Sequence, residues 1–298
     1  MNKTLATALT VVTAALALGT ATRADSAKPT TEADATYKDI EQTLGLVPTF
    51  LRAFPAEGIA AAWDELKTVQ LNPHTALNGK TKELIGLAVA AQIPCRYCTY
   101  FHTNVARLNG ATDQEIQEAI AMAAITRHWS TMLNGLQTDE AEFKKEVSRV
   151  FAYVVKPTGN NGPAIAVVDA PSAYKDIERT LGLVPSFLRT FPEDGIAAAW
   201  RELKTVQLNP NTALPGKTKE LIGLAVAAQI PCKYCIYFHT EAAKLNGASD
   251  KELREAVAMA ALTRHWSTVL NGAQIDEAAF RKEVEQIVTN ARKALAKR

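Results

Sequence analysis

Apolar and polar positions follow a helical period along most of this 298-residue chain. The stretch "TKELIGLAVAAQ" at residues 81–92 consists of strong helix formers and stops before Pro94, which would interrupt a continuous helix. A second helix is expected over residues 95–108, because the Asn109-Gly110 pair that follows is a usual helix end. The pattern therefore predicts two consecutive helices that are broken at the proline.

Helix start signals support the same prediction downstream. "TDQE" at residues 112–115 and "SDKE" at residues 249–252 have the spacing of a capping box, and each opens an apolar segment of helical period. Apart from a brief "AIAVV" at residues 164–168, the sequence has no run of alternating β-branched residues joined by tight Asn-Gly hairpins. The sequence therefore predicts an all-α fold.

The chain contains two copies of one domain sequence. Residues 37–149 are repeated as residues 174–288 at a constant offset of 137, and "GKTKELIGLAVAAQIPC" is identical in both copies. A repeat of this length indicates a duplicated domain rather than a solenoid unit. We therefore expect two tandem helical domains, in the order signal peptide 1–24, N-terminal linker 25–36, domain 1 at 37–150, linker 151–173 and domain 2 at 174–298.

The amino terminus has the features of a secretory signal. An early lysine precedes an apolar and small-residue stretch at residues 5–18, and Thr22-Arg23-Ala24 is an acceptable cleavage site. The stretch is shorter than the roughly 20 residues that a transmembrane helix needs. We therefore expect an exported, periplasmic protein without a membrane anchor.

The charge pattern excludes two classes of partner. Cleavage of the signal would remove Lys3 and Arg23 from the 33 basic residues and none of the 31 acidic ones, which leaves a formally neutral chain. A neutral chain with scattered charges offers no electrostatic surface to nucleic acid or to an anionic membrane. We therefore expect no nucleic-acid partner and no membrane partner.

Each copy contains two cysteines three residues apart and a histidine four residues after the second cysteine. On a helix, Cys95, Cys98 and His102 lie at positions i, i+3 and i+7, which share one face. The positive end of the helix dipole favours a thiolate in the first turn, and an imidazole can accept a thiol proton. This geometry suits a nucleophilic thiol next to a resolving thiol. The second copy repeats the set as Cys232, Cys235 and His239.

A carboxylate precedes each cysteine pair by twelve residues. Glu83 stands in this position before Cys95, as Glu220 does before Cys232. A carboxylate that faces the histidine would orient the ring and stabilise its protonated form. The alternative is a solvent-exposed glutamate in "KTKE".

Other chemistries of two cysteines and a histidine fit less well. A zinc site would need Glu83 or water as its fourth ligand, and covalent haem needs a histidine directly after the second cysteine, where Thr99 or Ile236 stands. A thioredoxin-like domain needs strands, and a disulfide across so short a loop adds little stability. We therefore expect redox-active thiols with no metal and no cofactor.

Two further repeated motifs are candidates for structural roles. His128 and His265, in "TRHWST", are expected to be hydrogen-bonded core or interface residues rather than catalysts. The stretch "LGLVPTFLRAFP" at residues 44–55 and its twin could line an apolar pocket, with ordinary helix packing as the favoured alternative.

The pattern E-x11-C-x2-C-x3-H resembles the core motif of the alkylhydroperoxidase AhpD and carboxymuconolactone decarboxylase superfamily. The flanking "GLVPTFLRAFP" and "LNGATDQEIQEAI" are similar to the family's flanking helices, and the resemblance covers both copies. It implies an all-helical fold, a ring of several chains and, for the branch with the cysteine pair, reduction of hydroperoxides through a Cys–Cys disulfide. It also implies a Glu–His proton relay to the thiols, formed by Glu83 and His102 for Cys95 and Cys98, and by Glu220 and His239 for Cys232 and Cys235.

One departure is that the family's hydroperoxidase prototype has a histidine between the cysteines, where this chain has Arg96-Tyr97 and Lys233-Tyr234. We expect an exported, thiol-dependent hydroperoxide reductase that forms homo-oligomers, acts on an organic hydroperoxide or hydrogen peroxide, and is reduced by an unidentified thiol. Cys98 is expected to attack and Cys95 to resolve, although the helix amino terminus could reverse these roles. The alternatives are a thiol-disulfide oxidoreductase or electron adaptor for a protein partner, and a non-redox enzyme of the carboxymuconolactone decarboxylase type that acts on a small organic acid or lactone.

Overall fold

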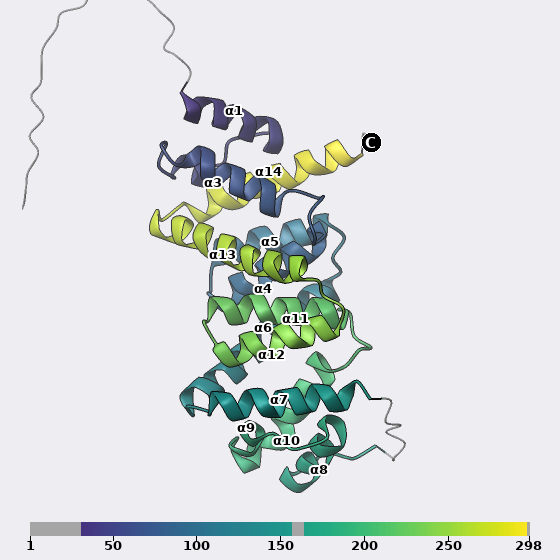
Figure 1. Ribbon diagram of the computed structural model, residues 1–298. Helices are drawn as coiled ribbons and strands as arrows, with labels where there is room; N and C mark the ends of the chain where they lie inside the picture. The colour runs from purple at the N-terminus through teal and green to yellow at the C-terminus, as the bar shows by residue number, and fades with distance from the viewer. Residues whose placement is uncertain (1–30, 157–163, 297–298) are drawn as a thin grey trace, which may run out of the picture. The chain divides into compact units, whose positions relative to one another are not determined.

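The computed structural model describes residues 31–156 and 164–296, so the expected signal peptide lies outside the described residues. The described residues form α-helices and two π-helical turns without any strand, which confirms the predicted all-α fold (Figure 1). None of the described helices is long and apolar enough to cross a membrane.

The two copies have the same order of helices. The first copy consists of α1 (Glu32–Leu44), α2 (Thr49–Arg52), α3 (Ile59–Glu65), the π-helical turn η1 (Leu66–Gln70), α4 (Gly79–Gln92), α5 (Arg96–Leu108), α6 (Asp113–Gly135) and α7 (Glu140–Val154). The second copy consists of α8 (Ala170–Leu181), α9 (Ser186–Arg189), α10 (Glu193–Glu202), η2 (Leu203–Gln207), α11 (Gly216–Gln229), α12 (Lys233–Leu245), α13 (Asp250–Gly272) and α14 (Glu277–Leu295).

Local sequence explains where the central helices begin. Asn78 caps α4 through its side chain. Cys95 is the N-cap of α5, one position outside the helix, and its sulfur accepts a hydrogen bond from the Cys98 N–H. Helices α6 and α13 begin with the two capping boxes expected from the sequence, at Thr112 and Ser249.

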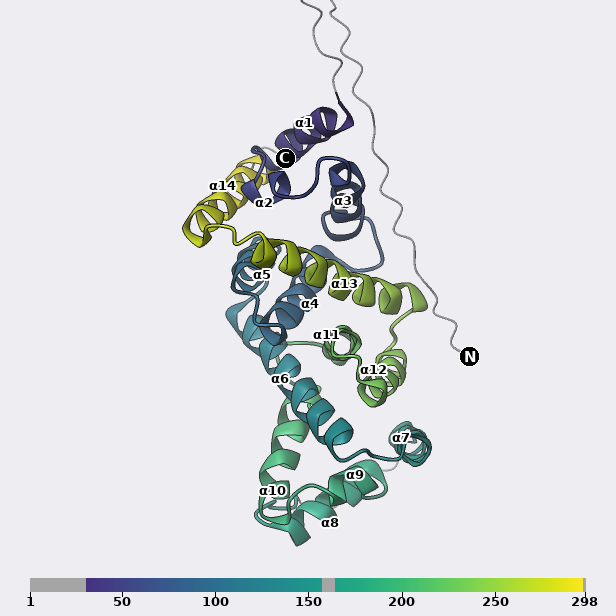
Figure 2. The same ribbon diagram turned by 90° about the vertical axis from the view of Figure 1, so that its left-hand side faces the viewer.

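The two copies exchange their last helices. Helix α7 packs on α8, α9 and α12 of the second copy, whereas α14 packs on α1 and α5 of the first (Figures 1 and 2). Between them, α4 and α11 contact each other, and each also contacts both α6 and α13. Residues Glu32–Arg298 therefore form one unit in which each copy completes the packing of the other.

The shared core is filled from both copies. Ile85 of α4, Met122 of α6, Ile222 of α11 and Met259 of α13 are fully buried members of one hydrophobic cluster. Burial of each such side chain contributes about 1.5–3 kcal/mol relative to exposure. Because the cluster draws on both repeats, its hydrophobic stabilisation depends on their association.

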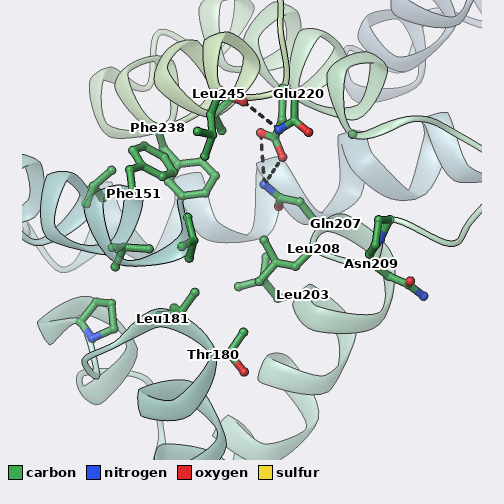
Figure 3. Close-up of a pocket in the computed structure, with 18 of the residues that line it drawn as sticks. Phe151, Thr180, Leu181, Leu203, Gln207, Leu208, Asn209, Glu220, Phe238 and Leu245 are labelled. Atoms are coloured by element: carbon green, nitrogen blue, oxygen red, sulfur yellow. Dashed lines mark hydrogen bonds between the residues drawn. The ribbon is translucent and has the colours of Figure 1, made fainter. Parts of the chain in front are cut away.

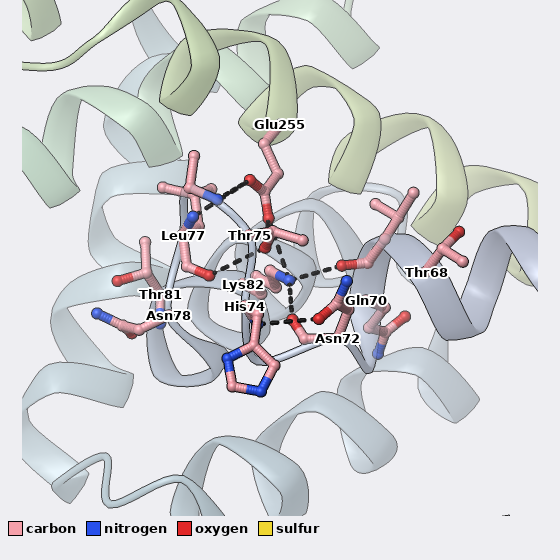
Figure 4. Close-up of polar contacts among 12 residues, drawn as sticks. Thr68, Gln70, Asn72, His74, Thr75, Leu77, Asn78, Thr81, Lys82 and Glu255 are labelled. Atoms are coloured by element: carbon pink, nitrogen blue, oxygen red, sulfur yellow. Dashed lines mark hydrogen bonds and ion pairs between the residues drawn. The ribbon is translucent and has the colours of Figure 1, made fainter.

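A buried ion pair adds a polar tie between the copies. The Lys82 side chain is fully buried, and its Nζ donates to the carbonyl oxygens of Val69 at 2.6 Å and Asn72 at 2.7 Å (Figure 4). The same Nζ lies 3.1 Å from Oε1 of Glu255, on α13 of the other copy. Glu255 also accepts the Ala76 N–H at 2.8 Å, so it fixes the loop between η1 and α4 as well. The reciprocal pair joins Lys219 to Glu118 at 2.9 Å.

Replacing Glu255 with alanine should destabilise the protein by about 3 kcal/mol or more, because Lys82 then stays buried without its counter-charge. Urea unfolding followed by far-ultraviolet circular dichroism measures the change. The control is Glu241→Ala, which removes a half-exposed pair with Lys244 and should leave the unfolding midpoint almost unchanged. Equal and small effects of the two substitutions would contradict a stabilising role for the buried pair.

Candidate active site

Each cysteine pair lies where a helix begins against the protein interior. The side chains of Cys95 and Cys98 are free thiols with 1% and 4% of their residue surface exposed. The Cys98 N–H donates to the Cys95 sulfur at 3.2 Å, so the two thiols lie together at the amino end of α5. The second copy repeats this contact between Cys235 and Cys232 at 3.3 Å.

A carboxylate on α4 holds the histidine of the same copy. Nδ1 of His102 lies 2.7 Å from Oε2 of Glu83, and both side chains are buried. The solvent-exposed alternative for Glu83 is therefore wrong. An ionised carboxylate can only accept, so this contact places the ring proton on Nδ1 and leaves the lone pair on Nε2. His239 and Glu220 make the equivalent contact at 2.6 Å.

Two residues that sequence reasoning did not single out fix this pair. Nε2 of Gln70, at the end of η1, donates to Oε1 of Glu83 at 3.0 Å. Gly86 leaves room for the imidazole, because a Cβ at this position would lie 2.3 Å from Cε1 of His102. Gln207 and Gly223 have the same roles in the second copy.

The other copy completes each site. Oγ1 of Thr263, on α13, lies 3.5 Å from Nε2 of His102, and Nδ2 of Asn271 donates to the Cys95 sulfur at 3.6 Å. Ser267 lies between them on the helix and hydrogen-bonds the cysteine pair. In the reciprocal site, Thr126 lies 3.3 Å from Nε2 of His239, and Ser130 and Asn134 bond Cys232. The sequence contained a signal for these contacts: a threonine, a serine and an asparagine follow each capping box at intervals of four residues, which places them on one face of the helix.

Hydrogen bonds divide the protons unequally between the two sulfurs. The hydrogen bond from the Cys98 thiol lowers the pKa of Cys95 to about 6 against the opposing effect of burial, with help from Ser267, the Cys98 N–H and Asn271. The same contact, together with burial, raises the pKa of Cys98. At neutral pH the site therefore holds a Cys95 thiolate and a Cys98 thiol. Cys232, with its pKa also lowered to about 6, and Cys235 repeat the arrangement.

The first site opens into an apolar cavity of about 400 Å³. Cys98 and His102 line it, together with Phe50, Phe101 and Trp266. Among the described residues that line this cavity, none is a lysine, arginine, aspartate or glutamate. Its size is that of a small-molecule site, and its walls suit an uncharged ligand. Ordinary packing was the favoured expectation for residues 44–55, and the structure shows both roles: Phe50 belongs to a buried hydrophobic cluster and also lines this cavity.

The remaining candidate residues lie outside the thiol sites. The ring of His128 packs against Trp129 and Phe191, and that of His265 packs against Phe54 and Trp266. His128 is exposed, and Nε2 of His265 is buried without a hydrogen-bond partner among the described residues, so the expected hydrogen-bonded core positions are not seen. Within the described ranges, no group of three or more histidine, cysteine, aspartate or glutamate side chains is placed to hold a metal ion.

Comparisons with known proteins find the same two repeats. The sequence model of the carboxymuconolactone decarboxylase family matches residues 57–140 and 194–278, more than half of the chain. The "Uncharacterized protein 4 in cox locus" of Paracoccus denitrificans is 46% identical over 52 residues, which cover 17% of this chain and 47% of that protein. This chain thus matches about half the length of that relative.

A solved structure supports the fold alone. The crystal structure of a Burkholderia xenovorans protein, assigned provisionally as a gamma-carboxymuconolactone decarboxylase subunit, has a TM-score of 0.53 and 16% sequence identity to this chain. The alignment covers 90% of this chain and 100% of the other.

Replacing Ser267 with alanine should raise the pKa of Cys95 by about one unit or more, because a hydrogen bond to a charged group contributes about 1.5–3 kcal/mol. Alkylation rates with iodoacetamide over a pH series, resolved by peptide mass, measure the pKa at each site. The pKa of Cys232 should stay near 6 in this variant. Ser130→Ala is the matched control and should have the reverse effect. A shift at Cys232 instead of Cys95 would contradict completion of each site by the other copy.

Proposed function

This chain belongs to the carboxymuconolactone decarboxylase family, and on that premise we propose that it is a thiol-dependent hydroperoxide reductase with one site in each repeat. The observation that carries the proposal is that Cys98 and His102 line the same cavity while a Cys95 thiolate lies against Cys98. An attacking sulfur, a base and a resolving sulfur are thereby held together in one site.

Two properties of the thiols support different roles for them. The low pKa of Cys95 favours it as the ready nucleophile, whereas access favours Cys98, because Cys98 lines the cavity that a substrate can enter. We give access the greater weight, since the peroxide must reach the sulfur in line with its O–O bond. Cys98 is therefore assigned as the attacking thiol, and Cys95 as the resolving one.

In the first step, the Cys98 sulfur attacks the terminal oxygen of the hydroperoxide. The O–O bond breaks, a sulfenic acid forms on Cys98, and the alcohol leaves. Within the described residues no direct hydrogen bond joins the imidazole of His102 to either sulfur, so the Cys98 proton reaches Nε2 through the bound hydroperoxide. The imidazole then gives this proton to the departing alkoxide.

In the second step, the Cys95 thiolate attacks the sulfur of the sulfenic acid. A disulfide forms as the S–O bond breaks, and the hydroxide that leaves takes a proton from solvent, which replaces the proton that Cys95 lost when it ionised. The cysteine pair loses two electrons and the peroxide gains them. An external thiol reductant must return the pair to its reduced form, and burial of both sulfurs restricts it to a thiol that can enter the cavity.

The cavity walls also bear on the alternatives. A small organic acid would bring a carboxylate, and no lysine or arginine lines the described cavity to pair with it. Disulfide exchange with a folded protein partner as the main activity is less supported, because the thiols are 1% and 4% exposed. Export to the periplasm and assembly into a homo-oligomer remain part of the proposal, on the strength of the sequence features alone.

The cysteine roles can be separated in a chain whose second site is disabled by Cys232→Ser and Cys235→Ser. In this chain, Cys98→Ser should abolish the consumption of cumene hydroperoxide. Cys95→Ser should instead stop after one attack and leave a sulfenic acid on Cys98, which dimedone traps for mass spectrometry. A sulfenic acid on Cys95 in the Cys98→Ser variant would reverse the roles. Unchanged thiols in the parent chain after peroxide treatment would remove the proposal.

The imidazole can be displaced without changing its chemistry. Gly86→Ala places a Cβ in the space of the His102 ring and should lower the peroxide rate constant of the first site about 100-fold, the size of a lost general-base contribution. Gly135→Ala is the matched control, because a Cβ there meets no heavy atom within 4 Å. Stopped-flow assays of the single-site chain measure both variants. Equal rates in the two variants would show that His102 does not contribute.

A further inference from the structure

The two thiol sites open into cavities of different form. In the first copy, one cavity of about 400 Å³ contains both Cys98 and His102. In the second copy, the corresponding space is divided into an outer cavity of about 310 Å³, which no cysteine lines, and an inner one of about 60 Å³, which holds Cys235 and His239. The two share the walls Phe187, Leu203, Gln207 and Phe238.

Phe151 is an aromatic side chain of the second site that lines the outer cavity and packs on Phe238, which lines both cavities. Its ring lies 5.5 Å from that of Phe238, and Figure 3 shows the two side chains together at one end of the outer cavity. At the offset of 137, Phe238 corresponds to Phe101, but Phe151 corresponds to Val288. In the first copy Phe101 therefore has no aromatic partner from α14, and the cavity continues to the thiol.

Two other differences between the cavity walls act in the opposite direction. Ile287 and Val105 of the first cavity correspond to the smaller Val150 and Ala242 of the second, so these changes would enlarge the second cavity. Tyr153 stands where the first copy has Asn290, but it lines neither cavity of the second copy, and its hydroxyl donates to the carbonyl oxygen of Arg179 at 3.2 Å.

We propose that Phe151 makes the two sites differ in substrate: the first site takes uncharged hydroperoxides with a bulky apolar body, and the second takes hydrogen peroxide. This inference rests on the proposed hydroperoxide reductase function. A volume of 400 Å³ lies within the range of small-molecule sites. A volume of 60 Å³ has room for only a few molecules the size of water. The chemistry of attack and disulfide closure is the same at both sites.

The test uses full-length chains with one working site each, made by replacing both cysteines of the other site with serine. Rates are measured with hydrogen peroxide and with cumene hydroperoxide, using dithiothreitol as reductant. The ratio of kcat/KM for cumene hydroperoxide to that for hydrogen peroxide should be about tenfold or more higher at the first site. Phe151→Val should raise this ratio at the second site, and Val288→Phe should lower it at the first.

The matched control is Val155→Ala, because this exposed valine at the end of α7 lines neither cavity, and the substitution should leave the ratio at the second site unchanged. Equal ratios at the two sites, or a ratio that neither Phe151→Val nor Val288→Phe moves, would overturn the assignment. The two variants act in opposite directions, so a general loss of folding in one of them cannot reproduce the expected pattern.

A second measurement does not depend on peroxide chemistry. Reduced protein is treated with N-methylmaleimide or the bulkier N-phenylmaleimide, and labelling of the two cysteine pairs is followed by peptide mass. The bulky reagent should label the first pair faster than the second, and Phe151→Val should remove the difference. If no peroxide is consumed but this labelling pattern holds, the reductase function fails and the difference in access stands. Equal labelling of both pairs by the bulky reagent would overturn the difference in access.

Discussion

The packing of α6 and α13 across the repeats is the constraint on which both sites depend. Each of these helices presents a threonine, a serine and an asparagine, four residues apart, to the cysteine pair of the other copy. A single repeat would leave its thiols without these donors and its α4 without half of the surrounding core. A shift of α6 or α13 along its axis would therefore misplace the donor set of the other copy.

The donors matter because the thiolate is buried. A pKa of about 6 in place of the usual value of 9.0 corresponds to about 4 kcal/mol of preference for the ionised form, in a position where burial alone acts in the opposite direction. The backbone supplies one donor because Cys95 is the N-cap of α5, and the rest come from Cys98 and the opposite repeat. The same donors make the thiolate pH-dependent: it is lost as the pH falls through about 6, and with it the charge that closes the disulfide.

Sequence reasoning succeeded where structure is local. Helix boundaries and capping boxes depend on neighbouring residues, and the duplication is visible as a repeated sequence. Glu83, Cys98 and His102 lie together as their spacing predicted, because they belong to two helices that follow each other in the chain. It missed Gln70, Gly86 and Ser267, whose roles exist only once η1, α4 and α13 meet. "TRHWST" drew attention to its histidine, whereas the structure turns its threonine and serine toward the thiols. The exchange of α7 and α14 had no signal in either repeat, because an apolar helix face indicates that a helix packs but not which helices it packs on.

Because α7 and α14 are exchanged, the residues that hold the thiols and the residues that line the path to them lie in different parts of the chain. The segment that carries the glutamate and reaches the first cysteine is identical in the two copies, whereas α7 and α14 differ at several positions. Because α7 lines the cavity of the second site and α14 that of the first, substitutions in these helices change the approach to one sulfur pair without touching the residues that hold it. Phe151 and Val288 are such a difference. A chain built in this way can keep one thiol chemistry and give its two sites different entrances.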